Sequence, residues 1–475
     1  MQESRITMTA GKLLSPIKGE LLRGSREVSF AGVSTDSRAV EKGQLFFALR
    51  GETFDGHDFV KEAIKKGAVA AVVNKDWIVD LPAYTRASII RVPDTLKALG
   101  DLAKRWRRRF DTRVAAITGS GGKTTTKEMT CAILSLEGLT LKNEGNFNNL
   151  IGLPLSLFRL DKSHQYAVLE MGMNRPGEIG RLTEIADPDI GLITNVGQAH
   201  IEGVGSIEGV ARAKVELLDK MAPRALAILN GDDRILMQAA AAFRKKPVTF
   251  GQGLQNTVRA EKIRNLGRDG FSFDIQYKGR SFSVRLRVPG FHNVSNALAA
   301  ASIALSLNLS KDQIQEGLSR FEGIKGRFKV VPLPDGSILI DDTYNSNPSS
   351  LRLALKSIKA IARQDRRVIV GLGEMLELGE ETESSHVEAG EMVAQAGADW
   401  LVALGDHAPE MIQGALDKGF SRKRVIRVRD YRDMGSKILE LMKPGDLVFL
   451  KASRRMGLER VAERLKKNAS GEGRL

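Results

Sequence analysis

The sequence holds a single cysteine, Cys131, among its 475 residues. One cysteine excludes an internal disulfide framework and favours a reducing compartment. Long apolar runs are also missing, because stretches such as 68–73 are far shorter than the ~20 residues of a membrane-spanning helix. No uninterrupted apolar segment near the N-terminus indicates a secretory signal. We therefore expect a cytoplasmic protein without stable membrane insertion.

Acidic residues are too few to balance the basic ones: 57 stand against 72, for a net charge of +15. Such a protein can bind nucleic acid, an anionic membrane surface or phosphorylated substrates. The densest basic cluster covers residues 104–109, but no helix-turn-helix, zinc-finger or RNA-recognition signature accompanies it. A nucleotide-gated nucleic-acid-binding protein is therefore the rival hypothesis, and we expect polyphosphate ligands without nucleic acid.

No internal repeat is visible, and the length exceeds what one ordinary core supports. Alternating apolar runs and helical stretches predict an α/β chain of three domains, at 1–112, 113–325 and 326–475. The central domain is expected to be a phosphate-loop domain with a parallel sheet and an antiparallel insert at 257–288. The last one is expected to be Rossmann-like, although it lacks the G-x-G-x-x-G dinucleotide fingerprint. The strands expected in the central domain are 114–117, 167–171, 190–194, 225–229 and 248–250. Those expected in the last domain are 337–341, 367–371, 400–404, 424–428 and 447–451.

The clearest motif is an apolar strand at 114–117 that runs into a glycine-rich loop and then a helix expected over 127–136. Glycines let backbone N–H groups surround phosphate oxygens, and the helix N-terminus adds a positive dipole. Lys123 can reach the terminal phosphates and Thr124 can bind magnesium. Ile117 stands where the common phosphate-loop pattern has its first glycine. Nucleoside triphosphate binding is predicted nevertheless.

Polar residues close two other expected strands of the central domain. Glu170 ends one apolar strand, as a magnesium-binding carboxylate would, and the stretch 195–200 follows another. His200 in that stretch can supply an imidazole, although a lone histidine is more often structural. In the first domain, the stretch 34–38 could hold a phosphate or a uracil edge, which alone is a weak signal.

Lys214 lies on the apolar stripe of a helix expected over 206–221, seven residues after Ile207. A lysine in this position must extend to solvent, form a pair or be modified. Loss of hydration would lower its pKa and leave a neutral, reactive amine.

Six stretches, taken in order, resemble the Mur ligase family of ATP-dependent, amide-forming enzymes over essentially the whole chain. Three are family-wide: the nucleotide loop 118–125, Glu-x-Gly at 170–172 and Asn-x-Gly-x-Ala-His at 195–200. Three resemble the branch that adds D-alanyl-D-alanine: 146–152, 341–348 and 373–379. The Asp-Asn-Pro-Arg motif typical of the branch that adds the third peptide residue is absent from the last domain.

The resemblance implies an ATP-dependent ligase that adds D-alanyl-D-alanine to UDP-N-acetylmuramoyl-tripeptide through an acyl phosphate, in peptidoglycan precursor synthesis. ATP and two Mg²⁺ ions are the implied cofactors, and a monomer is the implied state. The domain 1–112 would bind the UDP-substrate, 113–325 would bind ATP, and 326–475 would close over ATP and bind the dipeptide. Alternatives are another Mur ligase or a folylpolyglutamate synthase-like ligase, although the latter open almost directly on the nucleotide loop.

The resemblance also implies site residues. The implied catalytic residues are Lys123, Lys214 and His200. The implied ATP ligands are Gly119, Ser120, Gly121, Gly122, Lys123, Thr124, Thr125, Asn293, Arg327, Asp342 and Tyr344. The implied metal ligands are Thr124, Glu170, His200 and Lys214, the last one if carbamylated, as in the family's Ala-Lys-x-Glu context that residues 213–216 match. The implied substrate ligands are Thr35, Asp36, Ser37, Arg38, Asn146, Asn148 and Asn149. Lysine and diaminopimelate both remain open as the third residue of the tripeptide, and no general base is assigned.

Overall fold

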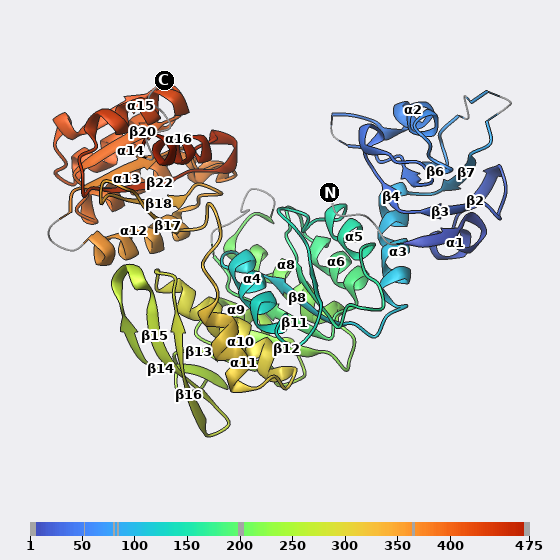
Figure 1. The fold of residues 1–475 in the computed structure, drawn as a ribbon, viewed down its shortest axis with the longest axis horizontal. Helices are drawn as coiled ribbons and strands as arrows, with labels where there is room; N and C mark the ends of the chain where they lie inside the picture. Colours follow the sequence, from blue (N-terminus) through green and yellow to red (C-terminus); the bar gives the residue numbers. More distant parts are fainter. Residues whose placement is uncertain are drawn as a thin grey trace. The chain divides into compact units, whose positions relative to one another are not determined.

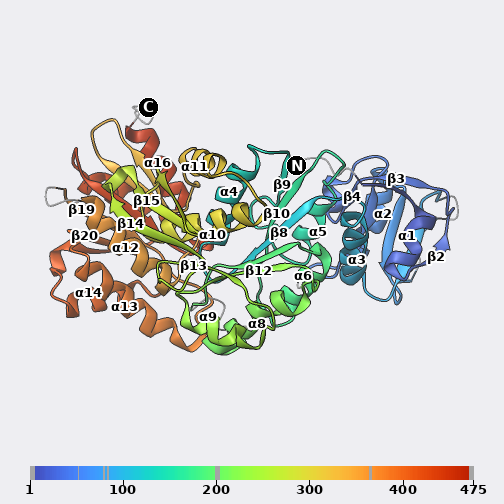
Figure 2. The same ribbon diagram turned by 90° about the horizontal axis from the view of Figure 1, so that it is seen from below.

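The computed structural model describes residues 6–51, 53–78, 81–82, 85–197, 204–362 and 366–469, and it confirms the expected α/β class (Figures 1 and 2). The chain divides into two compact units. The first comprises residues 1–118, 137–192 and 215–227, and the second comprises 119–136, 193–214 and 228–475. Among the described residues, no helix combines the length and the hydrophobicity that crossing a membrane requires.

The N-terminal part of the first unit is a five-stranded sheet in the order β2-β7-β6-β5-β4, parallel except for the edge strand β2. A two-stranded ribbon, β1-β3, accompanies it. The elements are β1 (Thr7–Thr9), α1 (Ala10–Ile17), β2 (Glu20–Arg23), β3 (Ser29–Ala31), β4 (Val33–Ser34), β5 (Leu45–Phe47), α2 (Val60–Lys65), β6 (Ala70–Asn74), β7 (Ser88–Val92) and α3 (Thr95–Arg107).

The rest of the first unit contains strands in the order β11-β8-β10-β9, in which β10 pairs in parallel with β8 and β9. Its elements are β8 (Arg113–Thr118), β9 (Thr140–Lys142), α5 (Gly152–Leu157), β10 (Tyr166–Glu170), α6 (Glu178–Ala186) and β11 (Ile190–Ile193). β8, β10 and β11 are apolar and almost entirely buried, which is why they can be read from the sequence as uninterrupted apolar runs. β9 is partly exposed at two of its three residues and was not among the expected strands.

In the second unit, the strand order β12-β13-β14-β15-β16 begins with parallel pairs and ends with antiparallel ones. This confirms the antiparallel insert expected at 257–288. The elements are α4 (Lys123–Leu134), α8 (Ile207–Lys220), β12 (Leu226–Asn230), α9 (Arg234–Ala239), β13 (Val248–Gly251), β14 (Val258–Asn265), β15 (Phe271–Tyr277), β16 (Arg280–Leu286), α10 (His292–Ser306) and α11 (Lys311–Ser319). Two of them are shared, because residues 215–220 of α8 and 226–227 of β12 belong to the first unit. Helices α10 and α11 both pack against α4.

The C-terminal part of the second unit is a Rossmann-like sheet in the order β17-β18-β22-β19-β20-β21, parallel except for β17. Helices α12, α13 and α14 cover one face, and α15 and α16 cover the other (Figure 1). The elements are β17 (Lys329–Pro332), β18 (Ile338–Asp342), α12 (Pro348–Ala362), β19 (Val368–Leu372), α13 (Thr382–Gln395), β20 (Trp400–Leu404), α14 (Ala408–Asp417), β21 (Val425–Val428), α15 (Tyr431–Leu441), β22 (Leu447–Lys451) and α16 (Glu459–Ala469).

Candidate active site

The loop between β8 and α4 depends on two glycines with positive φ angles, 146° at Gly119 and 80° at Gly122. A Cβ atom on Gly119 would lie 1.9 Å from Thr194 Oγ1, and one on Gly122 would lie 2.3 Å from Asn296 Oδ1. Glycine is therefore required by both the backbone conformation and the close packing. Helix α4 begins at Lys123 rather than at the expected residue 127. The N–H groups of its first turn consequently follow the loop directly, as an anion site requires.

Asn195, which follows β11, holds this loop in place. Its Oδ1 accepts a hydrogen bond from Gly121 N at 2.8 Å, its Nδ2 donates to Gly121 O at 3.1 Å, and its carbonyl accepts one from Ser120 N at 3.0 Å. Thr194 Oγ1 donates to the same Gly121 carbonyl at 2.6 Å. The loop is therefore fixed by residues more than 70 positions away in the chain. This clamp gives Asn195, the first residue of the stretch 195–200, a positioning role that the sequence alone did not reveal.

Two lysines of the second unit influence each other electrostatically. Lys123 Nζ donates a hydrogen bond to Gly119 O at 2.8 Å. Lys214 on α8 is only 2% exposed, and Val210 and Leu217, which lie about one turn to either side of it, are fully buried. Burial lowers the pKa of Lys214 well below its usual range, and the charge of Lys123 lowers it further. The expected apolar environment of Lys214 is confirmed, and a neutral amine is favoured there.

Glu170 closes β10 with a carboxylate that is 3% exposed. Its Oε1 accepts a hydrogen bond from Asn148 Nδ2 at 2.9 Å, whereas its Oε2 has no hydrogen-bond partner among the described residues. A buried carboxylate oxygen without a partner is unfavourable unless a cation or another donor reaches it. The described part of the chain contains no cluster of three metal-ligating side chains, and His200 lies outside the described residues.

The three asparagines expected to bind substrate have different surroundings. Asn148 contacts Glu170, as described above. Asn149 Oδ1 accepts hydrogen bonds from Ile151 N at 3.1 Å and Gly152 N at 2.8 Å, which orders the approach to α5. Asn146 is exposed. Asn149 is exposed as well, so both side chains are accessible, but Asn149 Oδ1 already has local partners.

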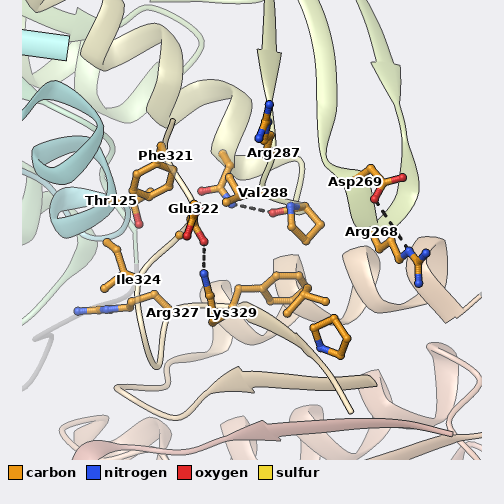
Figure 3. Close-up of a pocket in the computed structure, with 16 residues that line it drawn as sticks. Thr125, Arg268, Asp269, Arg287, Val288, Phe321, Glu322, Ile324, Arg327 and Lys329 are labelled. Carbon is orange, nitrogen blue, oxygen red and sulfur yellow. Dashed lines mark hydrogen bonds and ion pairs between the residues drawn. The ribbon is translucent and has the colours of Figure 1, made fainter. Parts of the chain in front are cut away.

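A cavity of about 550 Å³ lies within the second unit, beside the start of α4 (Figure 3). Thr125, Asn293 and Arg327, all expected to bind ATP, line it together with Arg287 of the antiparallel insert and Lys329. Asn293 is held by its Nδ2 donating to Pro289 O at 2.7 Å. Because Thr125 follows the phosphate loop directly, a nucleotide with its phosphates on that loop can place its nucleoside in this cavity.

Asp342 and Tyr344, also expected at the nucleotide site, lie where β18 ends. The ring of Tyr344 stacks with two guanidinium groups, Arg327 at 4.0 Å and Arg454 at 4.8 Å from its centroid. Asp342 is buried, and its Oδ2 accepts a hydrogen bond from Lys451 Nζ at 2.6 Å. No role was assigned to Lys451 from the sequence, although it ends the strand expected at 447–451. The available signal was a charged residue ending an apolar strand, but its partner lies 109 residues away.

The loop expected to bind the uridine diphosphate is organised by its own residues. Asp36 accepts hydrogen bonds from Arg38 N, Nε and one terminal nitrogen, each at 2.9 Å. The hydrogen bond from the Arg38 side chain is the main cause that lowers the pKa of Asp36. Ser37 is buried, while the Arg38 side chain is 84% exposed. Thr35 lies at the loop surface, partly exposed. The loop therefore presents an accessible guanidinium that already has a carboxylate partner.

The basic cluster at 104–109 is largely engaged in contacts within the first unit. Arg107 is buried and donates to Ala186 O at 2.9 Å and to Asp187 O at 3.2 Å, at the C-terminal end of α6. Arg108 pairs with Asp187 at 2.8 Å, and Arg109 stacks on Trp106. Positive side chains at a helix C-terminus stabilise its exposed carbonyl groups. This structural role explains two of the five basic residues of the cluster, Arg107 and Arg108, without a nucleic acid.

Models of three family domains match the chain. They are the Mur ligase middle domain over residues 117–304, the Mur ligase glutamate ligase domain over 326–454, and the Mur ligase family catalytic domain over 29–107. The chain is 35% identical over 461 residues to the UDP-N-acetylmuramoyl-tripeptide–D-alanyl-D-alanine ligase of Bacillus subtilis, covering 97% of this chain and 98% of the relative.

Solved structures agree. A crystal structure of MurF from Acinetobacter baumannii matches with a TM-score of 0.86 and 32% identity, over 98% of this chain and 100% of that one. The MurF ligase from Thermotoga maritima in complex with ADP matches with a TM-score of 0.81 and 28% identity, over 93% and 98%.

Proposed function

Because the chain belongs to the Mur ligase family, we propose that it joins D-alanyl-D-alanine to UDP-N-acetylmuramoyl-tripeptide with hydrolysis of ATP to ADP and phosphate. The observation that carries the proposal is the end-to-end similarity to ligases of that name, on a fold with a preformed phosphate loop. We further propose a monomer that works in the cytoplasm.

The proposed chemistry follows from the inertness of a carboxylate toward amines. Transfer of the γ-phosphoryl group to the terminal carboxylate of the tripeptide creates an acyl phosphate, with ADP as the leaving group. The dipeptide amine then attacks this carbonyl, and phosphate leaves from the tetrahedral intermediate. An α-amine has a pKa of about 8, so part of it is already neutral near pH 7. The chain therefore has to align reactants and neutralise charge, and no general base is assigned.

Lys123 and the first turn of α4 provide that neutralisation for the phosphates. Because Asn195 holds the loop through hydrogen bonds to Gly121, the loop N–H groups need little rearrangement when charge develops. Asn293 and Arg327 would hold the nucleoside in the cavity beside Thr125. Tyr344 would act there by keeping the Arg327 guanidinium in place.

The residues present fit magnesium, with two ions proposed. When bound, magnesium neutralises phosphate charge and polarises the transferred phosphoryl group. Glu170 offers a buried carboxylate oxygen that has no hydrogen-bond partner within the described part of the chain, and Mg²⁺ prefers such oxygen ligands. Thr124 and His200 would complete the ligand set, together with Lys214 as a carbamate. Lys214 fits this role because its buried amine is favoured in the neutral form that reacts with carbon dioxide.

The first unit would bind the sugar nucleotide. Thr35, Asp36, Ser37 and Arg38 would contact its uridine diphosphate, and Asn146 with Asn148 and Asn149 would contact the peptide end. The C-terminal Rossmann-like part would bind the dipeptide and exclude water, which otherwise hydrolyses the acyl phosphate.

The test is phosphate release combined with mass spectrometry of the product. The purified chain is given ATP, magnesium and D-alanyl-D-alanine with UDP-muramoyl-tripeptide that ends in lysine or, separately, in diaminopimelate. The proposal expects a UDP-muramoyl-pentapeptide with at least one of them. Phosphate release that responds only to folate with glutamate, or only to polynucleotide, would refute it in favour of the corresponding alternative.

A further inference from the structure

The linker that leads into β17 is folded into a tight loop. Arg327 N donates to Ile324 O at 3.0 Å, and φ is 73° at Gly326 and 50° at Phe328. A positive φ is ordinary for glycine but unfavourable for an aromatic residue by roughly 1–2 kcal/mol. Phe328 keeps this conformation only if contacts around it impose it. Arg327, which lines the nucleotide cavity, lies between these two residues.

The contacts that impose the conformation come from the end of β18. Phe328 N donates to Asp342 Oδ1 at 3.1 Å, and Tyr344 N donates to Gly326 O at 3.0 Å. The Phe328 ring is 5% exposed and belongs to the core of the C-terminal sheet, 6.3 Å from the ring of Phe449. The backbone on both sides of Arg327 is therefore fastened to the C-terminal sheet.

Lys451 completes this fastening from the neighbouring strand. The parallel register of β18 and β22 sets Lys451 opposite Asp342. Lys451 is 2% exposed, and its Nζ lies 2.6 Å from Asp342 Oδ2 and 3.0 Å from Asn345 O. The two oxygens of Asp342 are thus divided: one accepts from the lysine and the other from the linker. Without the lysine, a buried carboxylate would remain unpaired, which favours a rotation that releases Phe328 N.

We infer that Lys451 is a positioning residue for Arg327: it orients Asp342, Asp342 holds the backbone N–H of Phe328, and the linker then fixes the Arg327 guanidinium at the nucleotide cavity. The identity of the nucleotide rests on the proposed function, but the arrangement of these four residues does not.

The test measures ADP affinity by calorimetry in the full chain, without acceptor substrates, so that it does not depend on the ligase reaction. Lys451→Met should weaken ADP about tenfold, the equivalent of one lost hydrogen bond. Arg367→Met is the matched control. Arg367 also pairs with a buried carboxylate of the C-terminal sheet, Asp446, at 2.6 Å, but Asp446 precedes β22 and so lies at the opposite end of that strand from Lys451. The control should leave ADP affinity unchanged.

A double variant with Arg327 tests whether Lys451 affects ADP binding only by positioning that arginine. Arg327→Ala with Lys451→Met should bind ADP as weakly as Arg327→Ala alone, because the lysine acts only through the arginine. Additive losses would show that Lys451 contacts the nucleotide itself and would overturn the inference. So would an unchanged ADP affinity in a Lys451→Met protein that merely melts at a lower temperature.

A second pair of variants keeps the test available if Lys451→Met does not fold. Asp342→Asn with Lys451→Met leaves no buried charge unpaired, and the amide oxygen can still accept from Phe328 N. Asp342→Ala with Lys451→Met removes that acceptor. The variant with asparagine should keep its ADP affinity within about threefold of wild type. The variant with alanine should lose as much ADP affinity as Arg327→Ala does. Equal affinities in the two variants would overturn the inference.

Discussion

The phosphate loop and the loop at 34–38 are both expected to hold phosphates, but they are built differently. In the phosphate loop, two glycines are forced by close contacts, and Asn195 fixes the backbone from 74 positions away. In the other loop, Arg38 pairs with Asp36 two residues away, and its side chain is 84% exposed. A loop held by distant residues is preorganised, so its donors can stabilise the charge that develops in the transition state. An exposed arginine held only by a neighbouring residue contributes mainly to the affinity for the bound substrate.

The largest effect should come from the rigid loop. Lys123→Ala should lower kcat about 10²–10³-fold, as the loss of a preorganised donor to developing charge does. Lys311→Ala is a suitable control, because Lys311 also begins a helix of the second unit but is exposed. Steady-state phosphate release checks both variants, and circular dichroism checks the fold. Near-wild-type turnover of Lys123→Ala would contradict the phosphate-loop assignment and with it the contrast between the two loops.

Lys214 is buried in the same unit as the phosphate loop, and the charge of Lys123 acts on it. Lys214→Ala should lower kcat about 100-fold or more. Even residues that only contact the metal ligands change metal affinity or activity by about 10–100-fold. Short-chain carboxylates should restore part of the activity if they replace a carbamate. The direct measurement is ¹³C NMR of wild-type enzyme equilibrated with labelled bicarbonate, ATP and magnesium. If no carbamate resonance appears, the modification is refuted, and the loss in the alanine variant must come from the amine itself.

Local patterns in the sequence predicted those parts of the structure that depend on neighbouring residues. Buried parallel strands are continuous apolar runs, so the five parallel strands of the C-terminal sheet were predicted within about one residue at each end. The antiparallel edge strand β17 was missed, because Lys329–Pro332 is partly exposed and ends in proline. Glu170 and Lys214 were found because a charge on an apolar pattern is conspicuous.

Contacts between distant residues were not predictable. The Asn195 clamp and the Asp342–Lys451 pair join residues 74 and 109 positions apart, and no local pattern encodes such a pairing. The beginning of α4 was misplaced for a related reason. Three threonines after Lys123 are weak helix formers, so the helix-forming pattern is clear only from residue 127, whereas α4, which packs against α10, begins at Lys123.

The loss of folding stability at acid pH should differ between a buried histidine of the second unit and a hydrogen-bonded histidine of the first. His292, beside Asn293, has a buried Nδ1 without a hydrogen-bond partner among the described residues, and burial lowers its pKa from 6.5 to about 4. His57 of the first unit instead has both ring nitrogens engaged, with Asp55 and with Asn74 N. An unfolded chain binds a proton at His292 below about pH 6.5 that the folded chain resists, so folding stability falls between pH 6.5 and 4.

The loss from His292 should be about 2 kcal/mol between pH 7 and 5. His292→Asn cannot take up that proton, so its unfolding free energy should decline less steeply over this range, although other carboxylates and histidines still contribute. Urea unfolding at pH 7, 6 and 5 checks the prediction. Parallel pH profiles for the variant and the wild type would show that His292 is hydrated in the folded state and is no part of a rigid, dry region.

The smallest catalytic effect should come from the exposed loop. Arg38→Ala should raise the KM for the UDP-substrate only a few-fold, because a charge-assisted contact at an exposed site is weakened by solvent screening. The KM for the dipeptide and kcat should hardly change, since Arg38 would contact only the sugar nucleotide. Arg50→Ala is a matched control: Arg50 is an exposed arginine of the same unit that pairs with Asp55 at 3.2 Å, as Arg38 pairs with Asp36. It should leave both KM values unchanged. A fall in kcat for Arg38→Ala would mean that this loop also serves the chemical step, and the distinction between a rigid catalytic loop and a locally held binding loop would then fail.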